Sequence, residues 1–144
     1  DNLFVAGFIG SPQMNFVDAK CNIEGEKVSL TFDNTTVVLP PAKAKKLIEG
    51  NYNGKTVVMG VRPEDIDDSQ ITIETFKDSI IETDVTGYEL LGSEVLLYFE
   101  AAGVQMTANG DSRTPARLGD HIKLAIDPEK VDVFDKETEL IICN

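Results

Sequence analysis

The stretch FVDAKCNIEGEKVSLTFDNTTVVLP, residues 16–40, decides the fold. It contains three short runs rich in β-branched and aromatic residues, a composition typical of strands: Phe16–Ile23, Lys27–Phe32 and Thr35–Leu39. Turn-forming residues separate the runs, and Gly25 and Asn34 both tolerate the positive φ of a tight hairpin turn. The stretch therefore predicts two consecutive β-hairpins.

The same pattern continues through the rest of the chain. Further β-rich runs follow, each short and bounded by turn residues: Thr56–Val61, Thr72–Phe76, Ile80–Leu90, Glu94–Glu100, Val104–Ala108, His121–Ile126 and Val131–Phe134. One helix, Ala42–Glu49, interrupts the series, because Pro41 suits a first helical turn and Gly50 a helix end. Turn signals at intervals of roughly 8–12 residues are typical of a β-barrel or sandwich. We therefore expect a mostly β fold, and the single strand–helix–strand crossover argues against a doubly wound sheet.

Residues 2–9 are predicted to form a short N-terminal helix. Asp1 or Asn2 can cap this helix, and the Gly10-Ser11-Pro12 segment ends it. It is apolar on nearly all sides, which is typical of a buried element, and so short a helix needs a neighbouring surface for stability. The chain begins on this helix, at Asp1 instead of Met, so we expect it to be a piece of a longer protein.

The composition limits the classes of function. The chain has 144 residues, the size of one ordinary domain, and its 13 Lys+Arg against 25 Asp+Glu give a net charge of −12. Such a charge repels nucleic acid and anionic lipid unless basic residues cluster, and we find no cluster beyond Lys43, Lys45 and Lys46. No apolar run reaches the roughly 18 residues of a membrane span. We therefore expect no nucleic-acid partner.

Cys21 and Cys143 lie near opposite ends of the chain. Two separated thiols without a secretion signal are more often reduced than bridged, although the sequence leaves a bridge open. Neither these thiols nor the single histidine, His121, has the spacing of a zinc site. We therefore expect no metal site.

Three motifs that resemble catalytic or ligand-binding elements have simpler structural explanations. The segment Gly50–Thr56 has three residues between its glycines where a nucleotide-binding loop needs four, and a helix precedes it instead of a strand. His121 has no serine or cysteine nucleophile signature near it. The acids between Glu64 and Asp68 lack the alternating ligands and the glycine of a calcium loop. We therefore expect a turn, a strand start and a solvated acidic surface, and no catalytic residue.

Two segments are the candidate contact sites of the chain. In Phe8–Phe16 the N-terminal helix ends and the first strand begins, and in Gly60–Ile66 a strand ends at a charged pair around a proline. The proline holds the preceding arginine extended, which directs the guanidinium toward a carboxylate. The pattern is as consistent with domain-packing corners as with partner contacts. The candidate residues are Phe8, Pro12, Met14, Asn15, Phe16, Arg62 and Glu64.

These two segments also carry a resemblance to a known family. FVAGFIGSP at residues 4–12, followed by MNF at 14–16, resembles the domain junction of sugar-importer ABC ATPases of the maltose and multiple-sugar type. GVRPE at residues 60–64 is similar to the hallmark of the family's barrel. ELLGSE at residues 89–94 and FDKET at residues 134–138 match further along, in the same order. The resemblance covers essentially the whole chain.

The resemblance implies two parts with different origins. Residues 1–12 would be the terminal helix and junction of a nucleotide-binding domain that this chain lacks, and residues 13–144 would be the C-terminal regulatory domain, an OB-like β-barrel of the TOBE or MOP-like type. The Walker motifs, the signature motif and the switch histidine are absent from this sequence. The resemblance therefore implies ATP hydrolysis with ATP and Mg in the absent domain, and neither an enzyme nor a cofactor in this chain.

The resemblance also implies partners and a location. They are a second copy of the subunit, its own nucleotide-binding domain, permease subunits reached through that domain and, in enteric relatives, a phosphotransferase protein that reports glucose supply. The full protein would be cytoplasmic and peripheral at the inner face of the bacterial membrane. The alternative is an oxyanion-binding barrel, because related barrels of molybdate systems bind oxyanions. Those barrels carry a Ser-Ala-Arg-Asn type of motif, for which Asp111-Ser112-Arg113 is a poor substitute.

Overall fold

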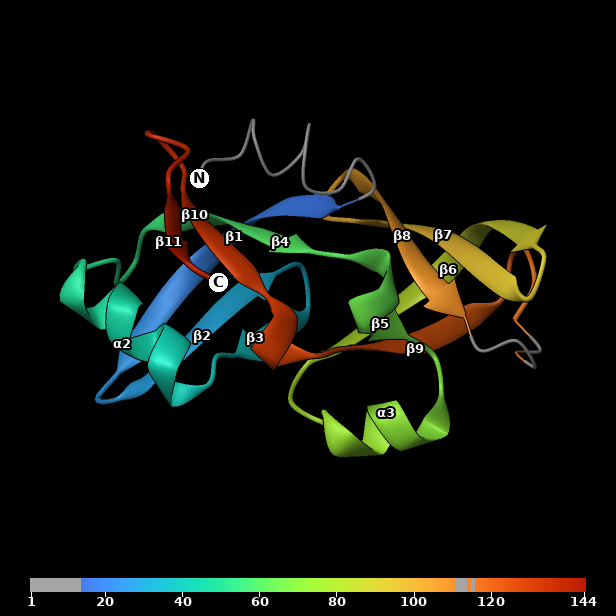
Figure 1. Ribbon diagram of the computed structural model, residues 1–144, viewed down its shortest axis with the longest axis horizontal. Helices are drawn as coiled ribbons and strands as arrows, with labels where there is room; N and C mark the ends of the chain where they lie inside the picture. The colour runs from blue at the N-terminus through green and yellow to red at the C-terminus, as the bar shows by residue number, and fades with distance from the viewer. Residues whose placement is uncertain (1–13, 111–113, 115) are drawn as a thin grey trace.

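Two antiparallel β-sheets form the protein in the computed structural model, which describes residues 14–110, 114 and 116–144 (Figure 1). One sheet has six strands in the order β11-β10-β4-β1-β2-β3, and the other has five in the order β5-β9-β6-β7-β8. Within the described part of the chain, the mostly β fold predicted from the sequence is therefore confirmed. The predicted helix at 2–9 lies outside the described residues.

The two predicted hairpins build one half of the six-stranded sheet. They comprise β1 (Asn15–Glu24), β2 (Lys27–Phe32) and β3 (Thr35–Val38), joined by tight turns between Glu24 and Lys27 and between Phe32 and Thr35. Gly25 takes the positive φ of the first turn, as expected. In the second turn Asp33, not Asn34, takes the positive φ of 51°, and its carboxylate accepts a hydrogen bond from the Ala102 N–H.

The other half of this sheet comes from the middle and the end of the chain. β4 (Thr56–Val61) pairs with β1 on one side and with β10 (Asp132–Asp135) on the other, and β11 (Ile141–Cys143) pairs with β10. Helix α2 (Pro41–Glu49) packs on β2 and β11 through Lys43, Ala44 and Leu47, which are buried. The short strand β11 is not among the strands predicted, because its three residues are too few to show a periodic pattern.

The five-stranded sheet curls into a nearly closed barrel. Its strands are β5 (Ile66–Asp67), β6 (Ile80–Leu91), β7 (Glu94–Ala101), β8 (Val104–Gly110) and β9 (His121–Ile126). At the open side, β8 lies against β5 and against the 3-10 helix η2 (Pro63–Asp65). A second 3-10 helix, η3 (Pro128–Lys130), leads into β10, and the side chain of Asp127 caps it by accepting a hydrogen bond from the Glu129 N–H.

One predicted strand is wrong. Thr72–Phe76 was expected to be extended, but Gln70–Thr75 forms helix α3. The Ser69 hydroxyl accepts a hydrogen bond from the Thr72 N–H, and the Asp67 carboxylate in turn accepts one from the Ser69 N–H at 2.5 Å. This capping outweighs the strand preference of the β-branched residues, because no side chain of α3 is buried and packing does not favour either conformation.

A single hydrophobic core runs through both sheets. Alternate residues of β1 point inward, as the burial of Val17, Ala19 and Cys21 shows, whereas β4 is buried from Val57 to Val61. The largest fully buried side chains come from both sheets and include Leu30, Met59, Phe99, Leu124 and Phe134. Because the core is continuous, the two sheets are packed against each other as one unit over the described residues.

Candidate functional site

The structure brings the two predicted contact segments together. Asn15 pairs with Val61 and Phe16 with Gly60 between β1 and β4, so that Arg62 follows directly beside the start of β1. We call Met14–Phe16 together with Gly60–Glu64 the junction corner. Phe8 and Pro12 of the prediction lie outside the described residues.

Asn15 connects the two sheets at the junction corner. Its side chain is buried, and the amide Nδ2 donates a hydrogen bond to the Thr107 carbonyl oxygen while the amide oxygen accepts one from the Thr107 N–H, each at 2.8 Å. Thr107 belongs to β8 of the five-stranded sheet, 92 residues further along the chain. The amide therefore bonds to β8 in the way that a neighbouring strand would, and it ties the first described residues to the barrel.

The corner is closely packed around Gly60. A Cβ atom at Gly60 would lie 3.0 Å from the Met14 sulfur, 3.1 Å from the Phe16 ring and 3.3 Å from the Phe134 ring. The two rings meet edge to face, with their centroids 5.9 Å apart and an interplanar angle of 72°. A side chain at position 60 would therefore displace the aromatic pair, which explains the glycine at this position.

The positive charge of Arg62 acts on two acidic residues, Asp132 and Asp65. It is extended before Pro63, with φ −78° and ψ 152°, and it is half-buried. Burial raises the pKa of Asp132, and the positive charges of Arg62 and Lys43 oppose that rise. Burial and the nearby Glu64 likewise raise the pKa of Asp65, and Arg62 is among the charges that oppose it. The guanidinium thus offsets two half-buried carboxyl groups, while Glu64 is exposed.

The predicted residues at the start of β1 also border a surface hollow. Met14, Asn15 and Phe16 form one side of a depression of about 500 Å³, and residues of β7 and β8 form the rest: Leu96, Tyr98, Val104, Gln105 and Thr107. The depression lies where the described chain begins. The arrangement suits a packing surface better than chemistry, because its lining has no ionisable group other than Tyr98.

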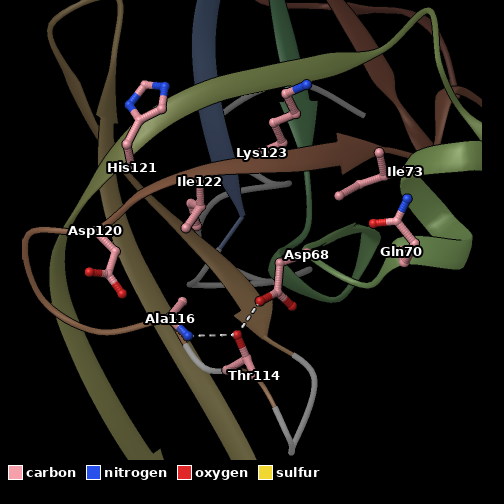
Figure 2. Close-up of a pocket in the computed structure, with 9 residues that line it drawn as sticks. All are labelled: Asp68, Gln70, Ile73, Thr114, Ala116, Asp120, His121, Ile122 and Lys123. Atoms are coloured by element: carbon pink, nitrogen blue, oxygen red, sulfur yellow. Dashed lines mark hydrogen bonds between the residues drawn. The ribbon is translucent and has the colours of Figure 1, made fainter.

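A second pocket, of about 560 Å³, lies between α3, β9 and the segment before β9 (Figure 2). Its polar groups bond to one another: the Thr114 hydroxyl donates to Asp68 and accepts from the Ala116 N–H at 3.1 Å. His121, the first residue of β9, lies on the opposite side of the pocket from Gln70 in this view. The Thr114 hydroxyl is already engaged and is not arranged as an activated nucleophile.

His121 is bound to acidic residues of the neighbouring strand. Its Nδ1 lies 2.8 Å from an Asp84 carboxylate oxygen and its Nε2 lies 3.4 Å from a Glu82 oxygen. The hydrogen bonds to Asp84 and Glu82 raise the pKa of His121, and the ring is largely exposed. The histidine therefore links β6 to β9 at a strand start, in agreement with the simpler explanation of this residue.

The other motifs also have structural roles. In the turn after α2, the Gly54 N–H donates to the Cys21 carbonyl at 2.7 Å, so the segment Gly50–Thr56 joins a helix to a strand as predicted. The acidic surface was expected to be solvated, but of its four acids only Glu64 is exposed; Asp65, Asp67 and Asp68 are half-buried. Asp67 accepts a hydrogen bond from Ser69, and Asp68 accepts one from Thr114. The second bond could not be predicted from the sequence, because its two residues are far apart in the chain.

Within residues 14–110, 114 and 116–144, no group of three or more His, Cys, Asp or Glu side chains is arranged to hold a metal ion. None of the described helices is long and apolar enough to cross a membrane. Cys21 and Cys143 are both buried and free, and burial raises the pKa of the Cys21 thiol to about 11. Both thiols are therefore core residues and not nucleophiles at neutral pH.

The sequence could not identify the partners of the junction corner. Thr107 and Asp132 lie on strands far away in the chain, and neither residue type signals a contact with Asn15 or Arg62. Only Gly60 carried a local signal, since a glycine inside a strand often marks a close approach.

Comparison with known proteins gives a consistent assignment. The family model for the TOBE domain matches residues 59–134, and the model for the MalK OB fold domain matches residues 10–66. The oligosaccharides import ATP-binding protein MsmX of Bacillus subtilis is 39% identical over 99% of this chain. The multiple sugar-binding transport ATP-binding protein MsmK of Streptococcus mutans is 38% identical over 98% of it, and the trehalose/maltose import ATP-binding protein MalK of Thermococcus litoralis 34% over 95%. The chain spans 38%, 37% and 36% of the lengths of these three relatives.

A solved structure supports the same fold. The cytoplasmic molybdate-binding protein ModG matches with a TM-score of 0.59 over 83% of this chain and 94% of its own, at 14% sequence identity. Such a low identity supports a likeness in fold only. Taken with the curved five-stranded sheet and the family models, it confirms the OB-like barrel that the motifs predicted. The chain belongs to the TOBE domain family and groups with the OB fold and TOBE regions of ATP-binding proteins of sugar-import ABC transporters.

Proposed function

We propose that this chain is the regulatory and dimerisation domain of the ATPase subunit of a carbohydrate ABC importer, and that it does not hydrolyse ATP itself. Its relatives are named as import or transport ATP-binding proteins, and the chain corresponds to little more than a third of their length. The proposed partners are a second copy of the subunit, its nucleotide-binding domain, the permease through that domain, and a regulatory protein. The proposed location is the cytoplasmic face of the bacterial membrane.

One observation carries the proposal: the junction corner joins the start of the described chain to both sheets at once. Asn15 is bonded to β8 of the barrel and paired with β4 of the six-stranded sheet. A displacement of Met14 would therefore be passed to both sheets together, because neither can move without breaking the part-buried hydrogen bonds of Asn15 or its pairing with β4. A domain that follows the movements of an ATPase and holds two subunits together needs this kind of rigid connection.

Arg62 offers a test of the dimerisation part. Replacing Arg62 by Ala makes the corner more negative by removing the positive charge that acts on Asp65 and Asp132, so we expect weaker self-association in sedimentation velocity experiments, by about threefold or more. Lys20→Ala is the matched control, because it removes one exposed positive charge from the middle of β1. Equal effects of both substitutions would contradict a role for the corner and indicate a general charge effect.

A second candidate function is oxyanion binding, which is favoured by the likeness in fold to the molybdate-binding protein ModG. In this chain Lys27 and Lys77 line a hollow of about 380 Å³ together with Asn34, Thr36 and Asp78. The net charge of −12 opposes anions at long range, although a local pair of lysines can override it. Titration calorimetry with molybdate, sulfate and phosphate tests this candidate. Stoichiometric heat that disappears in Lys77→Ala supports it, and no heat with any of the three contradicts it.

A further inference from the structure

The outer half of β6 has a free edge. β6 pairs with β9 only over Ile80–Asp84, and Val85 then exchanges backbone hydrogen bonds with Gly119 and Asp120. Beyond the bulge after Val85, the segment Gly87–Leu91 pairs with β7 alone. Among the described strands none lies on the other side of this segment, which projects at the end of the molecule away from α2 (Figure 1).

The hairpin geometry defines which backbone groups face the free edge. The turn Gly92-Ser93 joins Leu91 to Glu94 in a hairpin with two loop residues, so Leu91 and Glu94 form a hydrogen-bonded pair. Pairs alternate along an antiparallel ladder, and Leu90 and Tyr88 therefore occupy the pairs that are not bonded to β7. Their N–H and C=O groups therefore point away from β7, and within the described part of the chain no hydrogen bond reaches them from the other side.

The side chains beside this edge are apolar and exposed. Leu90 is 61% exposed and Leu91 47%, and Leu118 of the loop before β9 is 69% exposed. The loop is held against the edge segment, because the Arg117 guanidinium lies 4.7 Å from the centroid of the Tyr88 ring. Proteins usually protect free edges with lysine, proline or a covering element, and Gly87–Leu91 contains neither of these residues.

The charges around the edge decide which partner fits. Glu89 and Glu94 lie on the hairpin itself, and Asp120 lies in the adjoining loop. The Glu89 carboxylate accepts a hydrogen bond from the Tyr98 hydroxyl and that of Asp120 accepts one from the Arg117 N–H, and both keep their negative charge. The nearest described cation, Arg117, is already engaged by the Tyr88 ring and by the carbonyl oxygens of Thr114 and Ala116. A second copy of this chain would bring the same acids face to face, whereas a strand with lysine or arginine at its ends would be attracted.

We propose that the edge Gly87–Leu91 of β6 binds an extended segment of another protein, which carries apolar residues in alternation and a lysine or arginine near each end, as an added antiparallel or parallel strand. The backbone of Tyr88 and Leu90 supplies the hydrogen bonds, Leu90, Leu91 and Leu118 supply the apolar contacts, and Glu89 and Glu94 select the basic ends. This binding site is separate from the junction corner and does not depend on dimerisation.

The test uses two synthetic peptides of alternating valine and threonine, one with lysine at both ends and one with glutamate. Fluorescence anisotropy of the labelled peptides with the full chain measures affinity, and amide chemical shifts locate the contact. We expect the lysine peptide to bind at least about tenfold more tightly than the glutamate peptide, a difference of about 1.4 kcal/mol. Shifts should concentrate at Tyr88 and Leu90. Equal affinity for both peptides, or shifts confined to another surface, would overturn the proposal.

Substitutions at Leu90 separate the backbone contribution from that of the side chain. Leu90→Pro removes the outward N–H without breaking a bond to β7, so binding should fall about tenfold, while Leu90→Ala keeps the N–H and should lose less. Leu90→Lys tests the role of charge and leaves the backbone pairing with β7 intact. It should weaken the binding of the lysine peptide and strengthen the binding of the glutamate peptide. Two results would show that the edge does not bind the proposed partner. The first is that Leu90→Pro and Leu90→Lys leave the affinity for both peptides unchanged. The second is that the chain binds neither peptide and that these substitutions abolish its self-association instead.

Discussion

Where the two sheets meet, the side-chain amide of Asn15 makes the pair of hydrogen bonds that the backbone of a neighbouring strand would make. It is 6% exposed and both of its polar atoms bond to the backbone of Thr107. No other residue type of similar size presents a donor and an acceptor in one plane, so the position is specific to an amide. Val17 and Ala19, on the same strand, contribute only packing.

Asn15→Ala is therefore expected to lower the free energy of unfolding by about 2–3 kcal/mol, because the Thr107 N–H and C=O are left without partners in a partly buried place. Urea unfolding measures the change as a lower midpoint with an unchanged slope. Asn22→Ala on the same strand is the control and should change stability by less than about 0.5 kcal/mol. An equal loss in both variants would show that the bonds to Thr107 contribute nothing specific.

At the scale of elements, the turn after α2 is joined to the β10–β11 hairpin by one hydrogen bond. The Tyr52 hydroxyl donates to an Asp135 carboxylate oxygen at 2.7 Å, and the other Asp135 oxygen accepts from the N–H groups of Glu137 and Thr138. The bond from Tyr52 and those from the backbone lower the pKa of Asp135 to about 2, and the bond to Asp135 and burial raise the pKa of Tyr52 to about 12. The carboxylate therefore stabilises two connections at once.

The pH dependence of stability follows from the directions of these two pKa shifts. The pKa of Asp135 is lowered in the folded state, so its contribution to stability is present above the unfolded value near 4 and is lost as the pH falls toward 2. The pKa of Tyr52 is raised, so its contribution is lost as the pH rises from about 10 to 12. We expect the difference in thermal midpoint between the wild type and Tyr52→Phe to be constant near neutrality and to shrink in both windows. A difference that stays constant from pH 2 to 7 would contradict the link.

The elements that the sequence predicted are those whose signals are local. The hairpins of β1 to β3, helix α2, β4 and β9 follow from short runs bounded by turn residues, and their predicted bounds agree with the structure to within one residue. Helix α3 could not be predicted from its β-branched residues, because the hydrogen bonds of Ser69 and Asp67 decide it. The short strand β5 is set by pairing with β9, nearly sixty residues away, and so left no pattern of its own.

For the candidate site, local sequence signals identified two separate segments but not that they lie side by side. The two contact segments were identified from the sequence and the resemblance, and five of their seven residues lie together at the junction corner, Met14, Asn15, Phe16, Arg62 and Glu64. Their proximity is a property of the β1–β4 register. The residues of one segment do not indicate that the other segment lies beside it, because strand register, and not composition, brings the two together.

At the scale of the whole molecule, the net charge of −12 opposes the self-association that we propose for the junction corner. Two chains of this charge repel each other at long range, and salt screens that repulsion over a Debye length of about 8 Å at 0.15 M. Contacts between buried or half-buried groups are much less sensitive to salt. We therefore expect dimerisation to strengthen as the salt concentration rises, in contrast to binding of the basic peptide at β6, which should weaken.

Sedimentation equilibrium of the unmodified 144-residue chain, from micromolar to millimolar concentration, tests the central claim that this is a dimerisation domain. If the domain dimerises, the weight-average mass rises from 15.7 kDa toward twice that value, and the midpoint moves to lower protein concentration when the salt is raised. A mass that stays at 15.7 kDa over the whole range and at every salt concentration would contradict it.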